Sequence, residues 1–308
     1  MNNIMFNNRR QFLKLTSAIA GGLILPNTKL YADSMITKAI PKTGETIPVI
    51  GMGTSRTFDA SGDSALLTRL QQVTQAFFDA GGGMIDSSPM YGSSQNVIGS
   101  LLPKVSGNKN LFAATKVWID GKQAGIDQME ESRQQWGIPK FDLMQIHNLV
   151  DWRTHLDTLK QMKAEGKIRY IGITTSHGRF HDQLSTILSQ QDFDFVQLTY
   201  NIGNRDVEKP LLSIAQDKGI AVIVNRPYQR GSLFRQVKGK SLPPWAKDFD
   251  CQSWGQFFLK YAVSHPAVTC AIPATSKVKH MQDNMMAGRG QLPTQKQRSQ
   301  MLKYFAAL

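Results

Sequence analysis

Four ionisable side chains stand at or just after the ends of three successive apolar runs in this sequence. Asp86 ends the run GGMID and is followed by Tyr91, Lys116 ends FAATK, and His147 ends LMQIH. If these runs are neighbouring parallel strands, their carboxyl ends meet at one mouth, where barrel proteins place their chemistry. Alone, a strand-end lysine or histidine usually has an ordinary structural explanation. The combination indicates a catalytic site.

The chemistry that suits these four groups is the reduction of a carbonyl. Burying a carboxylate and an ammonium costs several kcal/mol unless they pair, so Asp86 and Lys116 are expected to form an ion pair on a pocket floor. A tyrosine is a poor acid at its ordinary pKa of ~10, but a neighbouring ammonium lowers that pKa. Tyr91 and His147 are therefore predicted to donate hydrogen bonds to an oxygen that gains negative charge as hydride arrives.

The elements that position these residues alternate regularly between strand and helix patterns. A helix is predicted where Leu66, Leu70, Val73 and Phe77 recur at helical spacing before three glycines. This alternation predicts an α/β fold, an eight-stranded parallel (β/α) TIM barrel. An open doubly wound sheet is the alternative, but it normally brings an early G-x-G-x-x-G turn, which does not follow the first strand. The predicted strands are 47–55, 83–88, 111–118, 141–147, 168–174, 194–201, 220–226 and 268–274.

Three segments lie outside this repeat. Residues 36–46 are expected to form a short N-terminal hairpin around Lys42, Thr43 and Gly44 that closes one end of the barrel, and residues 293–308 a C-terminal helix. The segment 229–250 is a long excursion, and long loops above a barrel are usually functional lids.

Residues 1–32 are predicted to be an export signal, which leaves 33–308 as the barrel domain. A basic start leads through RRQFLK into a short apolar stretch from Leu15 to Pro26. Arg9 and Arg10 followed by FLK resemble a twin-arginine signal, whose partner is the export machinery for folded proteins. We expect cleavage after Ala32, a periplasmic location and no stable membrane anchor, because the run is too short to span a bilayer. A disordered cytoplasmic tail or an uncleaved anchor is the alternative.

The charge and the cysteine residues of the chain limit which partners and sites are expected. The chain carries 36 Lys and Arg against 23 Asp and Glu, a formal charge of +13. No basic run with interleaved aromatic residues accompanies that charge, so a nucleic-acid partner is not expected. Cys251 and Cys270 lie beside no basic or histidine-rich run, so neither a reactive thiolate nor a metal site is predicted.

Asp86, Tyr91, Lys116 and His147 resemble, in order, spacing and context, the catalytic tetrad of the aldo-keto reductases. The similarity extends from about residue 47 to 284 and includes the motifs GGGMIDSSPMYG, FAATKVW and DLMQIHN. This resemblance implies an NAD(P)H-dependent oxidoreductase that reduces an aldehyde or ketone to an alcohol. It also implies that the tyrosine is the general acid, the lysine lowers its pKa, the aspartate pairs with the lysine and the histidine orients the carbonyl.

A dinucleotide is expected in the loops after the seventh and eighth strands. Barrels often bind phosphate there, where the free N–H groups of a helix N-terminus attract anions. The candidate residues are Arg230, Gly231, Ser232 and Leu233 after the seventh strand, and Thr275, Ser276 and Lys277 after the eighth.

The resemblance adds further cofactor positions and some departures. It places Asp283 and Asn284 at adenine and Gln197 at the nicotinamide carboxamide. Thr174 and Thr175 replace a Ser-Asn pair, and Asn225, followed by Arg226, replaces a stacking tyrosine. The usual basic residues for the 2′-phosphate correspond to Ala274 and His280, although Lys277 or Lys279 can supply charge. NADP is the expected cofactor, with NAD possible.

Two other function classes stay open at this point. A barrel aldolase or lyase would use Lys116 to form a Schiff base with a carbonyl substrate. A non-catalytic, ligand-binding barrel would use none of the four groups as a catalyst.

Overall fold

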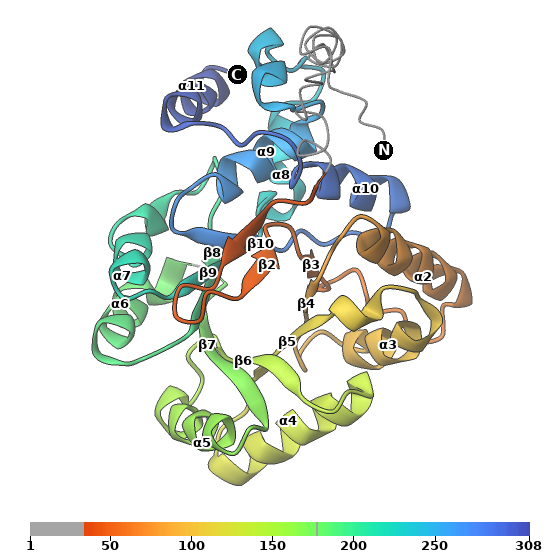
Figure 1. Ribbon diagram of the computed structural model, residues 1–308, viewed down its shortest axis with the longest axis vertical. Helices are drawn as coiled ribbons and strands as arrows, with labels where there is room; N and C mark the ends of the chain where they lie inside the picture. The colour runs from red at the N-terminus through yellow and green to blue at the C-terminus, as the bar shows by residue number, and fades with distance from the viewer. Residues whose placement is uncertain (1–33, 177) are drawn as a thin grey trace, which may run out of the picture.

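Eight parallel strands form a nearly closed barrel surrounded by helices (Figure 1). The computed structural model describes residues 34–176 and 178–308. Within that part of the chain each of the eight barrel strands pairs with the next one in sequence. Single bridges from Ile50 to Ala271 and from Gly53 to Ala274 connect the region of the first barrel strand to that of the last. The predicted barrel is therefore confirmed. Its strands are β3 (Met52–Gly53), β4 (Met84–Asp86), β5 (Phe112–Val117), β6 (Phe141–His147), β7 (Ile168–Thr174), β8 (Phe195–Thr199), β9 (Ala221–Asn225) and β10 (Val268–Ala271).

Helices follow the strands and cover the outside of the barrel. They are α2 (Ser64–Asp79), α3 (Ser94–Leu101), α4 (Lys122–Trp136), α5 (Trp152–Ala164), α6 (His181–Gln190), α7 (Leu211–Asp217), α8 (Ser232–Gln236), α9 (Trp254–Val263), α10 (Val278–Met286) and α11 (Gln295–Ala306). Short 3₁₀ turns lie at η1 (Leu102–Lys104), η2 (Asn108–Asn110), η3 (Gly178–Phe180), η4 (Asp206–Glu208), η5 (Gln229–Gly231) and η6 (Pro244–Phe249).

The helix α2 shows how the sequence sets these elements. The Asp63 side chain caps its start by accepting from the Leu66 N–H, at 2.8 Å. Its apolar stripe, which includes Val73 and Phe77, is buried against the barrel. After the helix the chain turns tightly and Gly82 passes close to the Phe77 ring. Only glycine fits there, because a Cβ at this position would lie 2.3 Å from the ring. The turn directs the chain into β4 and so places Asp86.

A short hairpin closes the end of the barrel opposite the catalytic mouth. Its strands β1 (Thr37–Ala39) and β2 (Thr46–Pro48) are antiparallel. Ile40 and Ile47 are buried in the same apolar cluster as Phe112, Phe195 and other inward-facing strand residues. The predicted hairpin is confirmed, and the barrel interior is a packed core.

The first strand is shorter than predicted. The expected strand 47–55 is divided, because residues up to Pro48 pair with β1, whereas only Met52 and Gly53 pair with β4. The chain passes very close to the last strand here, since a Cβ at Gly53 would lie 2.7 Å from the Ile272 carbonyl oxygen.

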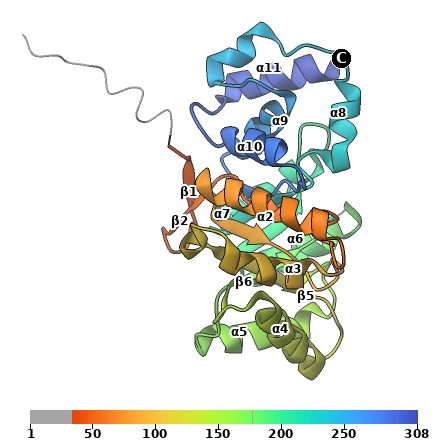
Figure 2. The same cartoon turned by 90° about the vertical axis from the view of Figure 1, so that its right-hand side faces the viewer.

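The long excursion after β9 contains η5, α8 and η6. Trp245 of η6 packs on Phe257 of α9 and on Tyr304 of α11, with ring centroids 6.1 and 5.8 Å apart. Figure 2 shows α8, α9 and α11 gathered at one end of the molecule, away from α4 and α5. A lid role for this segment stays a prediction.

The predicted export signal, residues 1–32, lies outside the described residues. No helix among the residues that the structure describes is long and apolar enough to cross a membrane.

Candidate active site

Asp86 and Lys116 form a buried ion pair at the carboxyl ends of β4 and β5. The Lys116 Nζ lies 2.5 Å from the Asp86 Oδ1, and both side chains are at most 2% exposed. The ammonium also donates to the Ser87 carbonyl oxygen at 2.6 Å. The ion pair expected on the pocket floor is therefore present.

Lys116 is held in its charged form. Burial alone lowers the pKa of this amine, but attraction to Asp86 and to Tyr91 outweighs burial and raises the pKa above its ordinary value. The ammonium lies 5.2 Å from the centroid of the Tyr91 ring. Tyr91 and Lys116 thus lie side by side, although they come from different strand ends.

His147, at the end of β6, meets the same group of side chains. Its ring lies edge-on to Tyr91, with centroids 6.1 Å apart, and 6.3 Å from the ring of Trp118. Burial, and next the charge of Lys116, lowers the pKa of His147 to about 2. The imidazole is therefore neutral and carries a single N–H.

Ser88 contacts one of the two ring nitrogens of His147. Its fully buried Oγ lies 3.0 Å from Nδ1 of His147, and its other contact is with the Met90 N–H, which is a donor. Within the described residues Nδ1 is thus the only acceptor for the Ser88 hydroxyl hydrogen. We infer that Nδ1 accepts, which leaves the imidazole hydrogen on Nε2.

A network of amides holds the second oxygen of Asp86. Its Oδ2 accepts from Nε2 of Gln145 at 2.8 Å and from Nε2 of Gln197 at 2.9 Å. The Oε1 of Gln197 accepts in turn from Nδ2 of Asn225 at 3.4 Å. The ion pair is therefore fixed by side chains from β4, β5, β6, β8 and β9.

Ser88 and Gln145 were not among the residues that the sequence indicated. Gln145 precedes His147 by two positions, so strand alternation points both side chains to the same face. Ser88 follows Asp86 by two positions in the same way. Period-two spacing from the ionisable residues was the signal that could have identified both.

The two loops expected to bind a dinucleotide lie next to one another. The Tyr228 hydroxyl, just after β9, donates to Oδ1 of Asn284 on α10 at 2.6 Å. The Nδ2 of Asn284 is buried and has no partner among the described residues, and the same is true of the hydroxyls of Thr174 and Thr175 at the end of β7. Buried polar atoms are normally satisfied, so these three can accommodate a polar ligand.

The other predicted cofactor residues differ in their burial and in the hydrogen bonds that they already form. Leu233 is fully buried and packs in the apolar core. Both oxygens of Asp283 accept hydrogen bonds, from Ser253 at 2.7 Å and from Gln256 at 2.8 Å. The remaining predicted residues are Arg230, Gly231 and Ser232, in η5 and at the start of α8, and Thr275, Ser276, Lys277 and His280, before and within α10.

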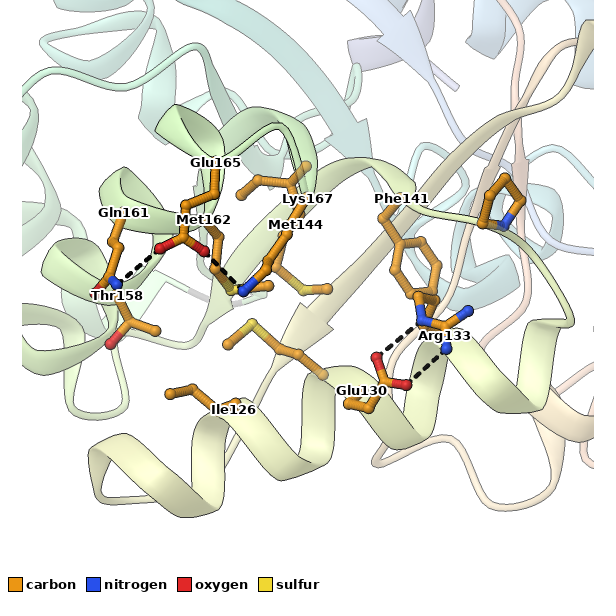
Figure 3. A pocket seen from close by; sticks show the side chains of 13 residues that line it. Ile126, Glu130, Arg133, Phe141, Met144, Thr158, Gln161, Met162, Glu165 and Lys167 are labelled. Atoms are coloured by element: carbon orange, nitrogen blue, oxygen red, sulfur yellow. Dashed lines mark hydrogen bonds and ion pairs between the residues drawn. The ribbon is translucent and has the colours of Figure 1, made fainter.

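A separate hollow of about 400 Å³ lies between α4 and α5 (Figure 3). Methionine and aliphatic side chains form its floor, and ion pairs between Glu130 and Arg133 and between Glu165 and Lys167 lie at its rim. It contains Phe141, which begins β6, whereas His147 ends that strand. The hollow therefore lies toward the opposite end of the barrel from the tetrad.

Comparison with known proteins points to one family. The sequence profile described as Aldo/keto reductase family matches residues 49–300. The methylglyoxal reductase YeaE of Escherichia coli is 25% identical over 259 residues, which cover 81% of this chain and 89% of that protein. An uncharacterized oxidoreductase of Schizosaccharomyces pombe is 31% identical over 170 residues, about half of each chain, at 53% and 52%.

Solved structures share the fold. An aldo/keto reductase from Klebsiella pneumoniae, in complex with NADP and acetate, has a TM-score of 0.73 at 21% identity, covering 87% of this chain and 94% of that one. The Bombyx mori aldo-keto reductase AKR2E4, in complex with NADP, has a TM-score of 0.70 at 21% identity, covering 88% and 93%.

Proposed function

The chain belongs to the aldo/keto reductase family, and we propose that it reduces an aldehyde or ketone to an alcohol with a nicotinamide cofactor. The observation that carries this proposal is the arrangement of four groups at one mouth. A protonated, buried Lys116 is paired with Asp86 and lies against Tyr91, and a neutral His147 lies edge-on to the same ring.

Each of the four groups has a distinct task in this proposal. A bound nicotinamide would supply the hydride for the carbonyl carbon. Tyr91 gives its hydroxyl proton to the carbonyl oxygen. The Lys116 ammonium stabilises the charge left on Tyr91, and Asp86 keeps that ammonium in place. The Nε2–H of His147 donates to the carbonyl oxygen and orients it. Because burial keeps the ring neutral, this N–H is present only in the tautomer with its hydrogen on Nε2.

We propose NADP as the cofactor, with NAD as the second candidate. The K. pneumoniae and B. mori structures contain NADP. Among the described residues the hydroxyls of Thr174 and Thr175 have no partner and suit the polar amide of a nicotinamide, and the Nδ2 of Asn284, likewise without a partner there, suits an adenine acceptor. Arg230 and Lys277 provide positive charge for phosphate groups near the same loops.

The Schiff-base alternative is disfavoured by the state of Lys116. Forming a Schiff base requires a neutral amine with access to substrate. Lys116 is fully buried, is paired with Asp86 and has a raised pKa. A non-catalytic barrel would leave the Tyr91 hydroxyl without a chemical task.

The test is a panel of aldehydes and ketones, followed by the loss of reduced-nicotinamide absorbance with NADPH and with NADH. We expect turnover of at least one carbonyl, and none with Tyr91→Phe. Folded protein that binds NADP but consumes no reduced nicotinamide with any member of the panel would refute the proposal.

We also propose that residues 1–32 direct export of the folded enzyme to the periplasm, on the evidence of Arg9, Arg10 and the short apolar stretch. Replacing both arginines by lysine should retain the protein in the cytoplasmic fraction. Unchanged fractionation of that variant would contradict export by this route.

A further inference from the structure

Three arginines lie at the catalytic mouth without any acidic partner. Arg56 follows the end of β3, and Arg226 and Arg230 follow the end of β9. In the described ranges 34–176 and 178–308, no ion pair and no side-chain hydrogen bond involves any of the three guanidinium groups. Clustered positive charge of this kind is a candidate site for an anion.

The backbone fixes the positions of Arg56 and Arg226. All three arginines have left-handed backbone angles, with φ of 65°, 49° and 54° in chain order, a conformation uncommon outside glycine. Just before Arg56, the hydroxyl of Thr54 donates to the Asp86 carbonyl at 3.0 Å. The carbonyl of Arg226 accepts from Nδ2 of Asn201 at 3.1 Å. Both arginines therefore stand on turns tied to the barrel mouth.

The guanidinium of Arg226 is the most enclosed of the three. Burial, and then repulsion from Arg230 and Arg56, lowers its pKa, while Tyr91 acts in the opposite sense. Arg226 therefore lies within electrostatic reach of the other two arginines and of Tyr91. Asp59, the acid of the Arg56 loop, is already hydrogen-bonded by the N–H and hydroxyl of Ser93, at 3.0 and 2.8 Å.

Two large apolar side chains close to the catalytic residues in space or in sequence are exposed. Trp118 is 40% exposed, although its ring lies 6.3 Å from His147, and Met90 is 41% exposed. Large apolar side chains exposed next to a buried catalytic group suit an aromatic or branched apolar substrate.

We propose that Arg226, assisted by Arg56, binds a carboxylate or phosphate group of the substrate, so that the enzyme reduces anionic carbonyl compounds with an aromatic or apolar body. This inference rests on the proposed function. The cofactor pyrophosphate is the other source of the same oxyanion chemistry. Arg230 is the arginine expected there, whereas Arg226 is the one within reach of Tyr91. A carbonyl polarised by Tyr91 then lies near a charged anchor.

The experiment compares 4-carboxybenzaldehyde with its neutral methyl ester, methyl 4-formylbenzoate, using the full chain and NADPH. We expect the wild type to have a KM about tenfold or more lower for the acid, as charge-assisted hydrogen bonds imply. Arg226→Gln should abolish that preference while changing the KM of the ester less than about twofold. Arg226→Lys should restore part of it, because an ammonium keeps the charge but not the planar fork.

Arg235→Gln is the matched control, because it removes the same charge from the exposed side of α8. It should keep the preference for the acid. Arg56→Gln provides a second variant if Arg226→Gln does not fold. Tryptophan fluorescence measures the dissociation constant for NADP in each variant.

Two outcomes overturn the inference but leave the proposed function standing. In one, the wild type reduces acid and ester with equal KM. In the other, Arg226→Gln weakens NADP binding but keeps the preference for the acid, which assigns the arginine to the pyrophosphate. Failure to reduce any carbonyl refutes both proposals.

Discussion

Replacing Ser88 by alanine tests how the reactive form of His147 is selected. In the structure the Ser88 hydroxyl faces Nδ1 of the ring at 3.0 Å, and its own hydrogen has no other acceptor among the described residues. Ser88→Ala removes this donor from a fully buried position and adds no new group. The ring stays neutral, because burial and Lys116, which lower its pKa, remain.

The size of the effect follows from one neutral hydrogen bond. Such a bond contributes about 0.5–1.5 kcal/mol net, which corresponds to a factor of about two to ten in the balance between the two neutral tautomers. A ring with its hydrogen on Nδ1 has no N–H on Nε2 to orient a carbonyl. We therefore expect kcat/KM to fall by about two- to tenfold in Ser88→Ala, while NADP affinity is unchanged.

The assay combines steady-state kinetics with ¹⁵N NMR of the imidazole nitrogens, assigned by the loss of signals in His147→Gln. Ser87→Ala is the matched control, because the Ser87 hydroxyl is equally buried but is hydrogen-bonded to the Thr54 hydroxyl, at 2.9 Å, and does not contact the ring. The imidazole ¹⁵N signals of His147 in Ser87→Ala should match those of the wild type. If Ser88→Ala also keeps wild-type signals and kcat/KM, another contact selects the tautomer and the reasoning is refuted.

Three further predictions concern the tetrad. Tyr91→Phe should lower kcat by at least about a hundredfold and leave the NADP dissociation constant nearly unchanged, measured by single-turnover kinetics and fluorescence titration; loss of both together would make Tyr91 structural. Asp86→Asn should destabilise the fold by about 3–5 kcal/mol in chemical denaturation, because Lys116 is left as an unpaired buried charge. Adding Lys116→Met should recover most of that loss, and additive losses would contradict the pairing argument. His147 has a folded pKa of about 2 against an ordinary 6.5, so below pH 6.5 the unfolded state binds a proton that the native state excludes. Stability should therefore fall by about 1.4 kcal/mol per pH unit from this group as pH drops through that window. His147→Gln should flatten the slope, and an unchanged slope would assign it to other groups.

The barrel was predictable because strand and helix periods alternate at regular spacing. Strand ends such as His147 and Thr174 were placed correctly, since a buried parallel strand is an apolar run that ends where polar residues begin. The boundary at 47–55 was not, because the same β-rich pattern serves two partners. Its first residues pair with β1, and only Met52 and Gly53 join β4. Strand patterns do not reveal which partner a strand has.

The four ionisable groups of the site were predictable, but their supporting contacts were not. Residue type and position at strand ends were enough to expect that Asp86 and Lys116 pair. The contact between Ser88 and His147 depends on register between separate strands, which sequence periodicity does not give. The arginines at the mouth have left-handed backbone angles. Glycine is the residue that usually indicates such angles in a sequence, and it does not occupy these three positions.

Gln197 shows how side-chain geometry changes an assignment made by resemblance. The resemblance gives it to the nicotinamide carboxamide. In the structure its Nε2 donates to Asp86 and to Gln145, at 2.9 and 3.2 Å, which uses both amide hydrogens. Its Oε1 already accepts from Asn225. Gln197 is therefore committed first to holding the ion pair.

The donors left at this edge are the hydroxyls on the neighbouring strand. Thr174 lies opposite Gln197 in the register of β7 and β8, and Thr175 follows it. Both hydroxyls are buried without a partner in the described part of the chain. A carboxamide at this position would meet two free hydroxyls and one remaining lone pair of Gln197. We therefore expect the two threonines, rather than Gln197, to donate hydrogen bonds to the nicotinamide.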